Sequence, residues 1–276
     1  MTTRVRQLSY PNPGSAGLPI MAPTQDEIDL LRHPNVVHWW DAEHGFDGEG
    51  WRCRKTGAPL VKERNSWPAL QKIAGYRNVP SFYFASGVNQ LWDGGLNMFP
   101  AGEFSFSVVG RSGPNQNSFM AGAATVGRTD MTYLQNSDTD GGAGSQGLRV
   151  NGGPSLGATL TDPTSLKYAD GPAWQLIGNR PQELSAPGYN SFIRTMRLDT
   201  GVESFIEGDA ANGNLPNVHR EFHVGGVNPY GSSVQGALVG GDLSRIVIFN
   251  VALNFDQALL DLERRVVRAR YSIPTP

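Results

Sequence analysis

The sequence is poor in cysteine and in charge, and it contains no long apolar run. Its 276 residues include one cysteine, Cys53, so no disulfide can form within the chain. Charged residues make up 17% of the sequence and the formal net charge is −2, which gives no basic surface for nucleic acid or an anionic membrane. No stretch approaches the roughly 18 apolar residues that span a bilayer, and the first residues lack the apolar core of a secretory signal. We therefore expect no nucleic-acid partner, no membrane insertion and synthesis without the standard export route.

Glycine and proline are plentiful by contrast. The 34 glycines and 19 prolines make up about a fifth of the chain, where average usage is about 12%. This excess predicts many turns, and therefore many short strands. The hydrophobic content of 39% argues against disorder.

Runs of β-branched and aromatic residues predict strands between these turns. The expected strands are Val36–Ala42, Glu103–Val109, Met131–Gln135, Gly147–Val150, Ala173–Gly178, Ser191–Leu198, Val202–Glu207, Arg220–Val224 and Leu243–Phe249. In Phe104–Val108 phenylalanines alternate with serines, as in a strand with one buried face. Trp39, Trp40 and Trp174 lie in these strands and are expected in the core. Strands spaced in this way, without helices between them, indicate an antiparallel sandwich or barrel.

The N-terminal region divides into an arm and a short helix. Residues 1–23 contain four prolines with glycines between them and predict an extended arm, either frayed or lying on a neighbouring subunit. Thr24 to Glu27 has the pattern of a capping box, so a helix is expected to begin here and to end at His33-Pro34. Residues 24–276 show no internal repeat and no second boundary, and we expect them to form one domain.

The last segment predicts an amphipathic helix that closes this domain. Asn254 is the expected N-cap, with Gln257 completing a capping box. The apolar face is expected to consist of Phe255, Leu259, Leu262 and Val266. Four arginines that match the helix dipole follow near the C-terminus, at Arg264, Arg265, Arg268 and Arg270. They are interpreted as a solvated helix end, with a basic binding patch as the alternative.

The segment Gly236–Asn250, with the Val251-Ala252-Leu253 step and the helix, resembles the closing signature of laminin G-like, concanavalin A-like jelly rolls. In that family a glycine-led strand, an acidic residue and an apolar strand ending near Phe-Asn precede a terminal helix. Arg220–Gly226 is similar to the family's penultimate strand, and Glu103–Ser112 to an early core strand. The resemblance implies an all-β fold, an antiparallel two-sheet jelly-roll sandwich with a C-terminal amphipathic helix.

The opening of the domain is similar to that of such domains in bacteriophage particle proteins. There a Trp-x-Asp-Ala strand is followed by a Trp-Arg-x-(Lys/Arg)-x-Gly segment. Here Val37–Ala42 is followed by Gly48–Arg52 and then by Lys55-Thr56-Gly57. The resemblance covers residues 36–272 and implies a virion protein made in the host cytoplasm, where a chain without disulfides folds.

A catalytic set is not evident in the sequence. Glycosidases of this fold place carboxylates on one strand as Glu-x-Asp-x-Glu, because the two-residue period puts them on one face. The nearest patterns here are Glu203 with Glu207 and Asp209, at the wrong spacing, and Asp138 with Asp140 in a glycine-rich turn. A serine nucleophile elbow and a phosphate-binding loop are also missing. We therefore expect no enzymatic activity.

The histidines and the cysteine show no metal or nucleophile pattern either. His219 and His223 are four residues apart in a predicted strand, where that spacing does not build a helical metal pair. Cys53 lies in the polar segment Trp51-Arg52-Cys53-Arg54 without a Cys-His-Asn signature. A structural role is expected for all three residues.

Two kinds of ligand site follow from the resemblance. Laminin G-like domains often hold calcium at the rim of the sandwich, and Asp138, Asp140 and Asp130 offer oxygen ligands near glycines. The same Asp-Thr-Asp-Gly-Gly sequence equally suits an ordinary tight turn, so the chain has either no cofactor or calcium. Tyr189 and Tyr230 lie in loops where they could stack on a carbohydrate, although exposed tyrosines are also typical of protein interfaces.

These expectations lead to three hypotheses of function. The first is a non-enzymatic virion protein, a capsid decoration or a tail or fibre component that contacts other virion proteins and forms homo-oligomers. The second is a lectin-like module that recognises a glycan of the host surface. The third is a polysaccharide-degrading enzyme, and the fold alone does not decide between them.

Overall fold

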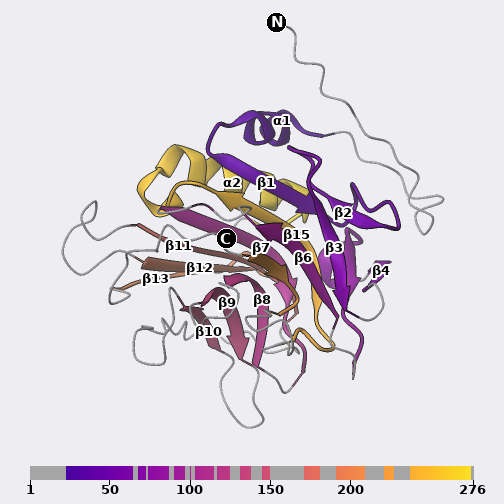
Figure 1. Cartoon of the computed structure of the whole chain (residues 1–276). Coiled ribbons are helices and arrows are strands. Elements are labelled where there is room, and N and C mark those ends of the chain that lie inside the picture. Colours follow the sequence, from indigo (N-terminus) through magenta and orange to yellow (C-terminus); the bar gives the residue numbers. More distant parts are fainter. Residues whose placement is uncertain are drawn as a thin grey trace, which may run out of the picture.

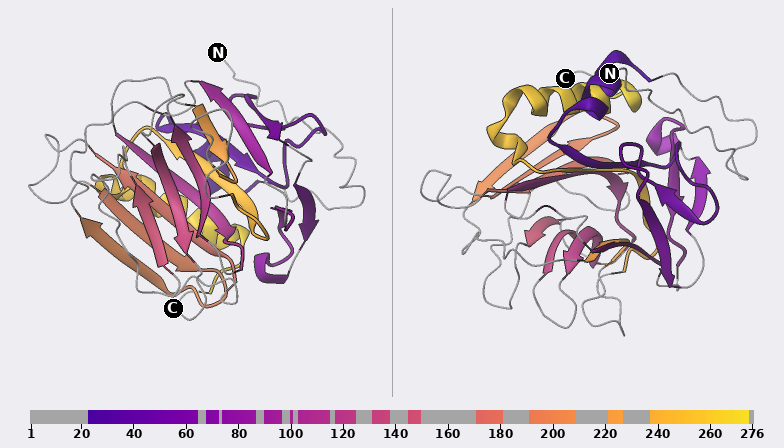
Figure 2. Two further views of the ribbon diagram at one scale, coloured as in Figure 1. Left: turned by 60° about the horizontal axis from the view of Figure 1, so that its bottom comes forward. Right: turned by 45° about the horizontal axis from the view of Figure 1, so that its top comes forward.

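The computed structural model describes residues 23–64, 68–72, 74–86, 90–96, 100, 103–114, 117–124, 131–137, 145–149, 171–180, 191–208, 221–226 and 237–274. They form two antiparallel β-sheets packed face to face, with two helices on the outside of one sheet (Figure 1). The right-hand view of Figure 2 shows these layers edge-on, with the helices on one side of a sheet and the second sheet on the other. The predicted antiparallel sandwich with a C-terminal helix is confirmed.

The helix-covered sheet, called sheet A, has eight strands. Seven of them run in the order β13-β12-β11-β7-β15-β5-β4, and β1 pairs with β15 beside β5. Their bounds are β1 (Val36–Asp41), β4 (Ala69–Lys72), β5 (Pro80–Tyr83), β7 (Phe104–Arg111), β11 (Ala173–Asn179), β12 (Ser191–Arg197), β13 (Glu203–Gly208) and β15 (Asp242–Phe249).

The other sheet, called sheet B, has seven strands in the order β10-β9-β8-β14-β6-β3-β2. Their bounds are β2 (Gly50–Arg52), β3 (Pro59–Arg64), β6 (Leu91–Leu96), β8 (Asn117–Ala124), β9 (Met131–Ser137), β10 (Ser145–Arg149) and β14 (Glu221–Val224). The helices are α1 (Gln25–Arg32), α2 (Gln257–Arg270) and the 3₁₀ turns η1 (Ala74–Tyr76) and η4 (Leu253–Phe255).

The core between the two sheets is dominated by aromatic side chains. Trp51, Phe82 and Trp92 are fully buried and pack with ring centroids 4.6–4.9 Å apart. Trp40 stacks on Phe222 in the same core, as predicted for a buried tryptophan. Large rings placed on both facing sheets fill the interior, which explains why Trp40 and the Phe104/Phe106 alternation indicate a core in the sequence.

A second core lies between sheet A and the helices. Trp39 and Trp174 of the sheet pack there with apolar side chains of α2. The middle of sheet A is therefore buried on both faces, and the prediction that β7 has one buried face is wrong. Ser105 and Ser107 are fully buried, because their hydroxyls bond to the helical layer: Ser105 donates to the carbonyl of Val251 at 2.8 Å, and Ser107 bonds to Glu263.

The two helices begin differently from one another. The predicted capping box of α1 is confirmed, with Thr24 Oγ1 accepting from the Glu27 amide at 3.2 Å and Glu27 accepting from the Thr24 amide at 3.1 Å. The predicted Asn254 cap of α2 is wrong, because residues 253–255 form the turn η4 and delay the start of the helix. Asp256 is the N-cap instead and accepts from the Leu259 amide at 3.1 Å.

The buried face of α2 also differs from the prediction. Phe255 lies outside the helix and is exposed, whereas the face that packs on the sheet consists of Leu259, Leu260, Glu263, Val266, Val267 and Arg270. A glutamate and an arginine thus lie within the apolar face, and Arg270 is not part of a solvated helix end. Among the described helices, none is long and apolar enough to cross a membrane.

Candidate functional site

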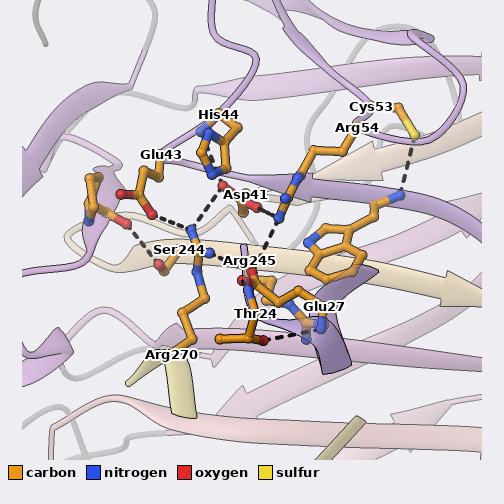
Figure 3. A network of polar contacts seen from close by, with 12 residues as sticks. Thr24, Glu27, Asp41, Glu43, His44, Cys53, Arg54, Ser244, Arg245 and Arg270 are labelled. Atoms are coloured by element: carbon orange, nitrogen blue, oxygen red, sulfur yellow. Dashed lines mark hydrogen bonds and ion pairs between the residues drawn. The ribbon is translucent and has the colours of Figure 1, made fainter. Parts of the chain in front are cut away.

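A buried polar cluster ties α1, β1 and α2 together, and Figure 3 shows it. Arg270 bonds to three carboxylates, with Glu27 at 2.9 Å, Asp41 at 3.2 Å and Glu43 at 2.6 Å. Arg54 reaches the other oxygen of Asp41 at 2.7 Å and places its guanidinium 4.6 Å from the Trp39 ring centroid. The cluster joins segments from both ends of the described chain.

The charges of this cluster compensate one another within buried ion pairs, and we call the cluster the lock between α1, β1 and α2. Burial opposes the ionised form of Asp41, but the guanidiniums of Arg270 and Arg54 outweigh it and hold the pKa of Asp41 well below its usual range. The same carboxylates raise the pKa of Arg270 despite its burial. Asp41 is fully buried and Arg270 nearly so, which leaves no room for a substrate at either group. The cluster therefore positions the helices and is not a candidate for catalysis.

A second ion pair crosses the same layer. Arg245 of β15 and Glu263 of α2 are fully buried and form a bidentate pair at 2.5 and 2.8 Å. Ser107 bonds to Glu263 and accepts from the Trp174 indole at 2.8 Å. These contacts close the middle of sheet A on its helical side, so ligand-binding surfaces must be sought elsewhere.

An exposed surface remains where sheet A extends beyond α2. We call it the edge surface, and it consists of Arg180, Arg194, Glu203, Phe205, Glu207, Asn254 and Phe255. Phe205 is 41% exposed and Phe255 is 43% exposed. The Arg194 guanidinium lies 3.7 Å from the Phe205 ring centroid, and that of Arg180 lies 4.7 Å from the Phe255 centroid.

Hydrogen bonds hold the polar groups of the edge surface in place. Arg194 donates to Asn254 Oδ1 at 2.7 Å, and Asn254 in turn donates to Glu207. Glu203 accepts from Arg194 at 3.3 Å and from Arg264 of α2 at 2.5 Å. Exposed rings fixed by guanidiniums resemble the anchors of protein interfaces, where aromatic and arginine side chains are enriched.

The two carboxylates of the edge surface are held by neighbouring side chains. Glu203 and Glu207 lie on the same face of β13, as their register with Met196 and Phe192 shows. Four residues of strand separate their Cα atoms by about 13 Å, and hydrogen bonds through Arg194 and Asn254 join the two side chains. Each carboxylate is also bonded to an arginine or an asparagine.

Sheet B carries a smaller polar group on β14 and β6. His223 lies opposite Asp93 in the strand register, and its Nε2 is 3.8 Å from Glu221 Oε2. Burial lowers the pKa of His223 to about 4, against the opposing effect of Asp93, so the imidazole is neutral at pH 7. In the segments that the structure describes, no group of three or more His, Cys, Asp or Glu side chains could hold a metal ion.

The residues predicted to bind ligands lie outside the described residues. Tyr189 and Tyr230, proposed for carbohydrate, and Asp138 and Asp140, proposed for calcium together with Asp130, all remain predictions. So does the N-terminal arm, of which only Pro23 is described. Cys53 is buried, and its sulfur accepts from the amides of Trp39 at 3.2 Å and Thr56 at 3.4 Å, which is a structural role.

The sequence does not predict the edge surface. Its pattern places Phe255 on the buried helix face and indicates the acidic residues of β13 only as catalytic candidates, whereas Phe255 is exposed. Glu203, Phe205 and Glu207 are two residues apart and share one face of the predicted strand. A ring between two carboxylates on one face indicates that this face is not part of the core. The arginines that cover the rings come from other elements and have no local signal.

The fold is similar to that of solved structures of low sequence identity. A Trypanosoma rangeli sialidase mutant displaying trans-sialidase activity matches with a TM-score of 0.52 and 13% identity, over 84% of this chain and 33% of the sialidase. A SAP-like pentraxin from Limulus polyphemus matches with a TM-score of 0.48 and 11% identity, over 65% of this chain and 79% of the pentraxin. Tailspike protein 2 of Escherichia coli O157:H7 bacteriophage CAB120 matches with a TM-score of 0.47 and 15% identity, over 71% and 26%.

The chain thus covers 33–34% of the length of the sialidase structures that it matches. At these identities the likeness concerns the fold alone, a concanavalin A-like β-sandwich. No protein-family model and no curated protein matches the sequence.

Proposed function

We propose that this chain is a non-enzymatic binding and assembly module of a bacteriophage virion, mounted as a capsid decoration or as a tail or fibre component. The edge surface is the observation that carries the proposal. It exposes Phe205 and Phe255 beside fixed arginines, whereas the ion-pair clusters around Arg245 and Arg270 are buried. An exposed apolar group with a polar rim is the composition of a contact surface.

The arrangement of acidic groups supports a role without catalysis. Glu203 and Glu207 are both engaged within the chain, Glu203 by Arg194 and Arg264 and Glu207 by Asn254. Glu27, Asp41 and Glu263 are buried in ion pairs and out of reach of a polysaccharide. The polysaccharide-degrading alternative therefore has no support from the described residues.

The phage assignment rests on the opening sequence pattern. In the fold, Trp40 and Trp51 of this pattern belong to the core, and Asp41 and Arg54 belong to the lock between α1, β1 and α2. The residues of the pattern therefore serve two structural purposes: they fill the core between the sheets, and they attach the helices to sheet A. A chain that shares it with phage particle proteins is expected to share this architecture and its use in particles.

Mass spectrometry of virions purified from the phage that encodes this chain tests the proposal. We expect the wild-type chain in the particles, and we expect the double variant Phe205→Ala, Phe255→Ala to be lost from them. Val61→Ala, which removes a similarly exposed apolar residue from sheet B, is the matched control and should be retained. Absence of the wild-type chain from virions, or retention of the double variant, would overturn the proposal.

A second candidate function is glycan binding, and the same exposed rings favour it. Phe255 and Phe205 lie beside Arg194 and Asn254, and an aromatic face next to hydrogen-bonding groups suits a sugar ring. The predicted Tyr189 and Tyr230, and calcium held by Asp138 and Asp140, would belong to this function. A glycan array probed with and without added calcium tests it. If the protein binds no glycan on the array in either condition, this candidate function is contradicted, and the proposed virion role is unaffected.

A further inference from the structure

We infer that β13 is a pairing edge through which two copies of this chain join in an antiparallel, twofold-symmetric contact that continues sheet A from one copy into the other. The inference rests on the proposed assembly function and names the partner of the edge surface. Three observations support it: β13 has few features that prevent pairing with another strand, some of its amides and carbonyls face away from β12, and its two ends carry opposite charges.

The edge strand β13 carries few of the features that usually keep sheet edges apart. Natural edges are short, or carry charged side chains (lysine above all), proline or a bulge, because a regular exposed edge recruits another strand. Of the other described strands at sheet ends, β2 has three residues, β4 has four, including Lys72, and β10 has five. The strand β13 is longer, with six residues, ESFIEG, and it has no lysine or proline and no break in its register with β12. Its charged residues, Glu203 and Glu207, are bonded within the chain to arginines and to Asn254. Val202, just before it, is 54% exposed.

The backbone of β13 points hydrogen-bonding groups away from the sheet. The Arg197 amide of β12 donates to the Val202 carbonyl at 3.1 Å, so residue 202 faces β12. Because the direction alternates along an antiparallel strand, the amides and carbonyls of Glu203, Phe205 and Glu207 face away from β12. Among the strands that the structure describes, β12 is the one neighbour of β13. The outward groups are those that an added strand would bind.

A second copy of β13 fits this edge when Ser204 lies on the twofold axis. In that register Glu203 lies opposite Phe205 of the second copy, and Val202 lies opposite Ile206, so the exposed valine is covered and no like charges oppose each other. Gly201 is level with Glu207 of the second copy but lies outside the backbone pairing, because its amide donates to the Arg197 carbonyl and its carbonyl accepts from Arg268. Arg268 of α2 donates to the Gly201 carbonyl at 3.2 Å and to the Pro274 carbonyl at 2.6 Å, so its guanidinium lies at the end of the strand that receives Glu207 of the second copy. The two ends of the strand are therefore complementary in charge, as a contact between identical surfaces requires.

Light scattering coupled to size-exclusion chromatography of the full chain tests whether β13 is the contact. Wild type should have twice the mass of one chain. Phe205→Lys, which places a charge on the edge, should have the mass of one chain, while the control Val61→Lys, 42% exposed before substitution, should remain a dimer. A monomeric wild type, or a dimer that survives Phe205→Lys, would overturn the inference.

Charge reversal tests the register. Glu207→Arg alone and Arg268→Glu alone should each weaken the dimer at least tenfold, because like charges then meet, and the double variant should recover it. Circular dichroism of each variant separates loss of fold from loss of contact. Single variants that dimerise like wild type would overturn the register. Failure of this inference is distinct from failure of the proposed function, since a monomeric chain can still be found in virions.

Discussion

Glu263 and Arg245 illustrate how much a single buried charge matters in this molecule. Both side chains are fully enclosed between α2 and sheet A, and each compensates the other with two hydrogen bonds. Removal of charged groups from water is costly, and the pair offsets that cost only while both partners are present. Burial and Glu263 act in opposite directions on Arg245, and the glutamate prevails, so the pKa of Arg245 is raised.

We predict that Glu263→Gln lowers the free energy of unfolding by about 3–5 kcal/mol, because it leaves Arg245 charged and uncompensated. Urea denaturation at pH 7 measures this. Asp261→Asn, two residues earlier on the same helix and half-exposed in its pair with Arg264, is the control and should cost less than about 1 kcal/mol. Equal losses in the two variants would contradict the importance of the buried pair.

Asp256 gives a second prediction at this scale. Asp256→Ala removes the side chain that accepts from the Leu259 amide and should destabilise the protein by about 1 kcal/mol. Asp256→Asn keeps an accepting oxygen and should retain most of the stability. Thermal unfolding of both variants distinguishes them, and an asparagine variant as unstable as the alanine variant would count against the cap.

At the scale of elements, the helical layer depends on Arg270. Its guanidinium joins α2 to Glu27 of α1, and to Asp41 and Glu43 at the end of β1. Arg265, on the same helix, makes an exposed pair with Asp26 of α1. Two arginines that contact the same helix α1 thus differ mainly in burial, which makes them a matched pair for experiment.

Arg270→Met should destabilise the protein by about 3–5 kcal/mol, since three carboxylates lose a shared cation in a buried site. Amide exchange in α1 should accelerate, because the helix loses its main polar tie to α2. Arg265→Met should cost less than about 1 kcal/mol and leave the exchange of α1 unchanged. Hydrogen–deuterium exchange with mass spectrometry checks both, and slow exchange of α1 in the Arg270 variant would refute the lock.

The sequence predicted elements well where one face of a segment is apolar and bulky. The nine strands expected from β-branched and aromatic runs all occur, with ends displaced by one or two residues. Strands such as β6 (LWDGGL) and β8 (NSFMAGAA) were missed, because glycine and alanine carry little strand preference and their pairing is decided by neighbours far along the chain.

The remaining differences have a common physical cause. The hydropathy pattern predicts that Glu263 and Arg270 face solvent, because both are charged. They are buried nevertheless, because Arg245, Asp41 and Glu27 from other elements compensate their charges. No local pattern reveals such compensation. The edge surface was missed for a similar reason: Arg180 and Arg194 reach the exposed rings only after the sheet has formed.

At the scale of the whole molecule, stability should depend on pH through two buried histidines. Burial lowers the pKa of His223 to about 4, and burial with nearby Lys55 lowers that of His38 to about 4. In the unfolded chain a histidine titrates near 6.5. The unfolded state therefore binds more protons between these values, so stability is full above pH 6.5 and falls as the pH drops toward 4.

Between pH 6.5 and 4 we predict a loss of about 3 kcal/mol from His223, taking 1.36 kcal/mol per pKa unit. His223→Gln should remove much of this slope, measured as the free energy of unfolding in urea at several pH values. Asp41 acts in a lower range: its contribution is present above the usual aspartate pKa and is lost as the pH falls below that value. A variant with the same slope as wild type would contradict the role of His223.

The position of α2 has a consequence for how the protein is made. Strands β1, β7 and β11 leave the ribosome long before residues 257–270, so Trp39, Trp174 and Leu176 have no cover during most of synthesis. A nascent chain or a fragment that stops before Gln257 exposes this apolar surface, which chaperones and proteases bind. Once α2 packs on the sheet it covers the apolar surface and places Arg268 beside Gly201, at the end of the edge strand. Synthesis of α2 therefore both covers this apolar surface and supplies the cation that the proposed pairing of β13 requires.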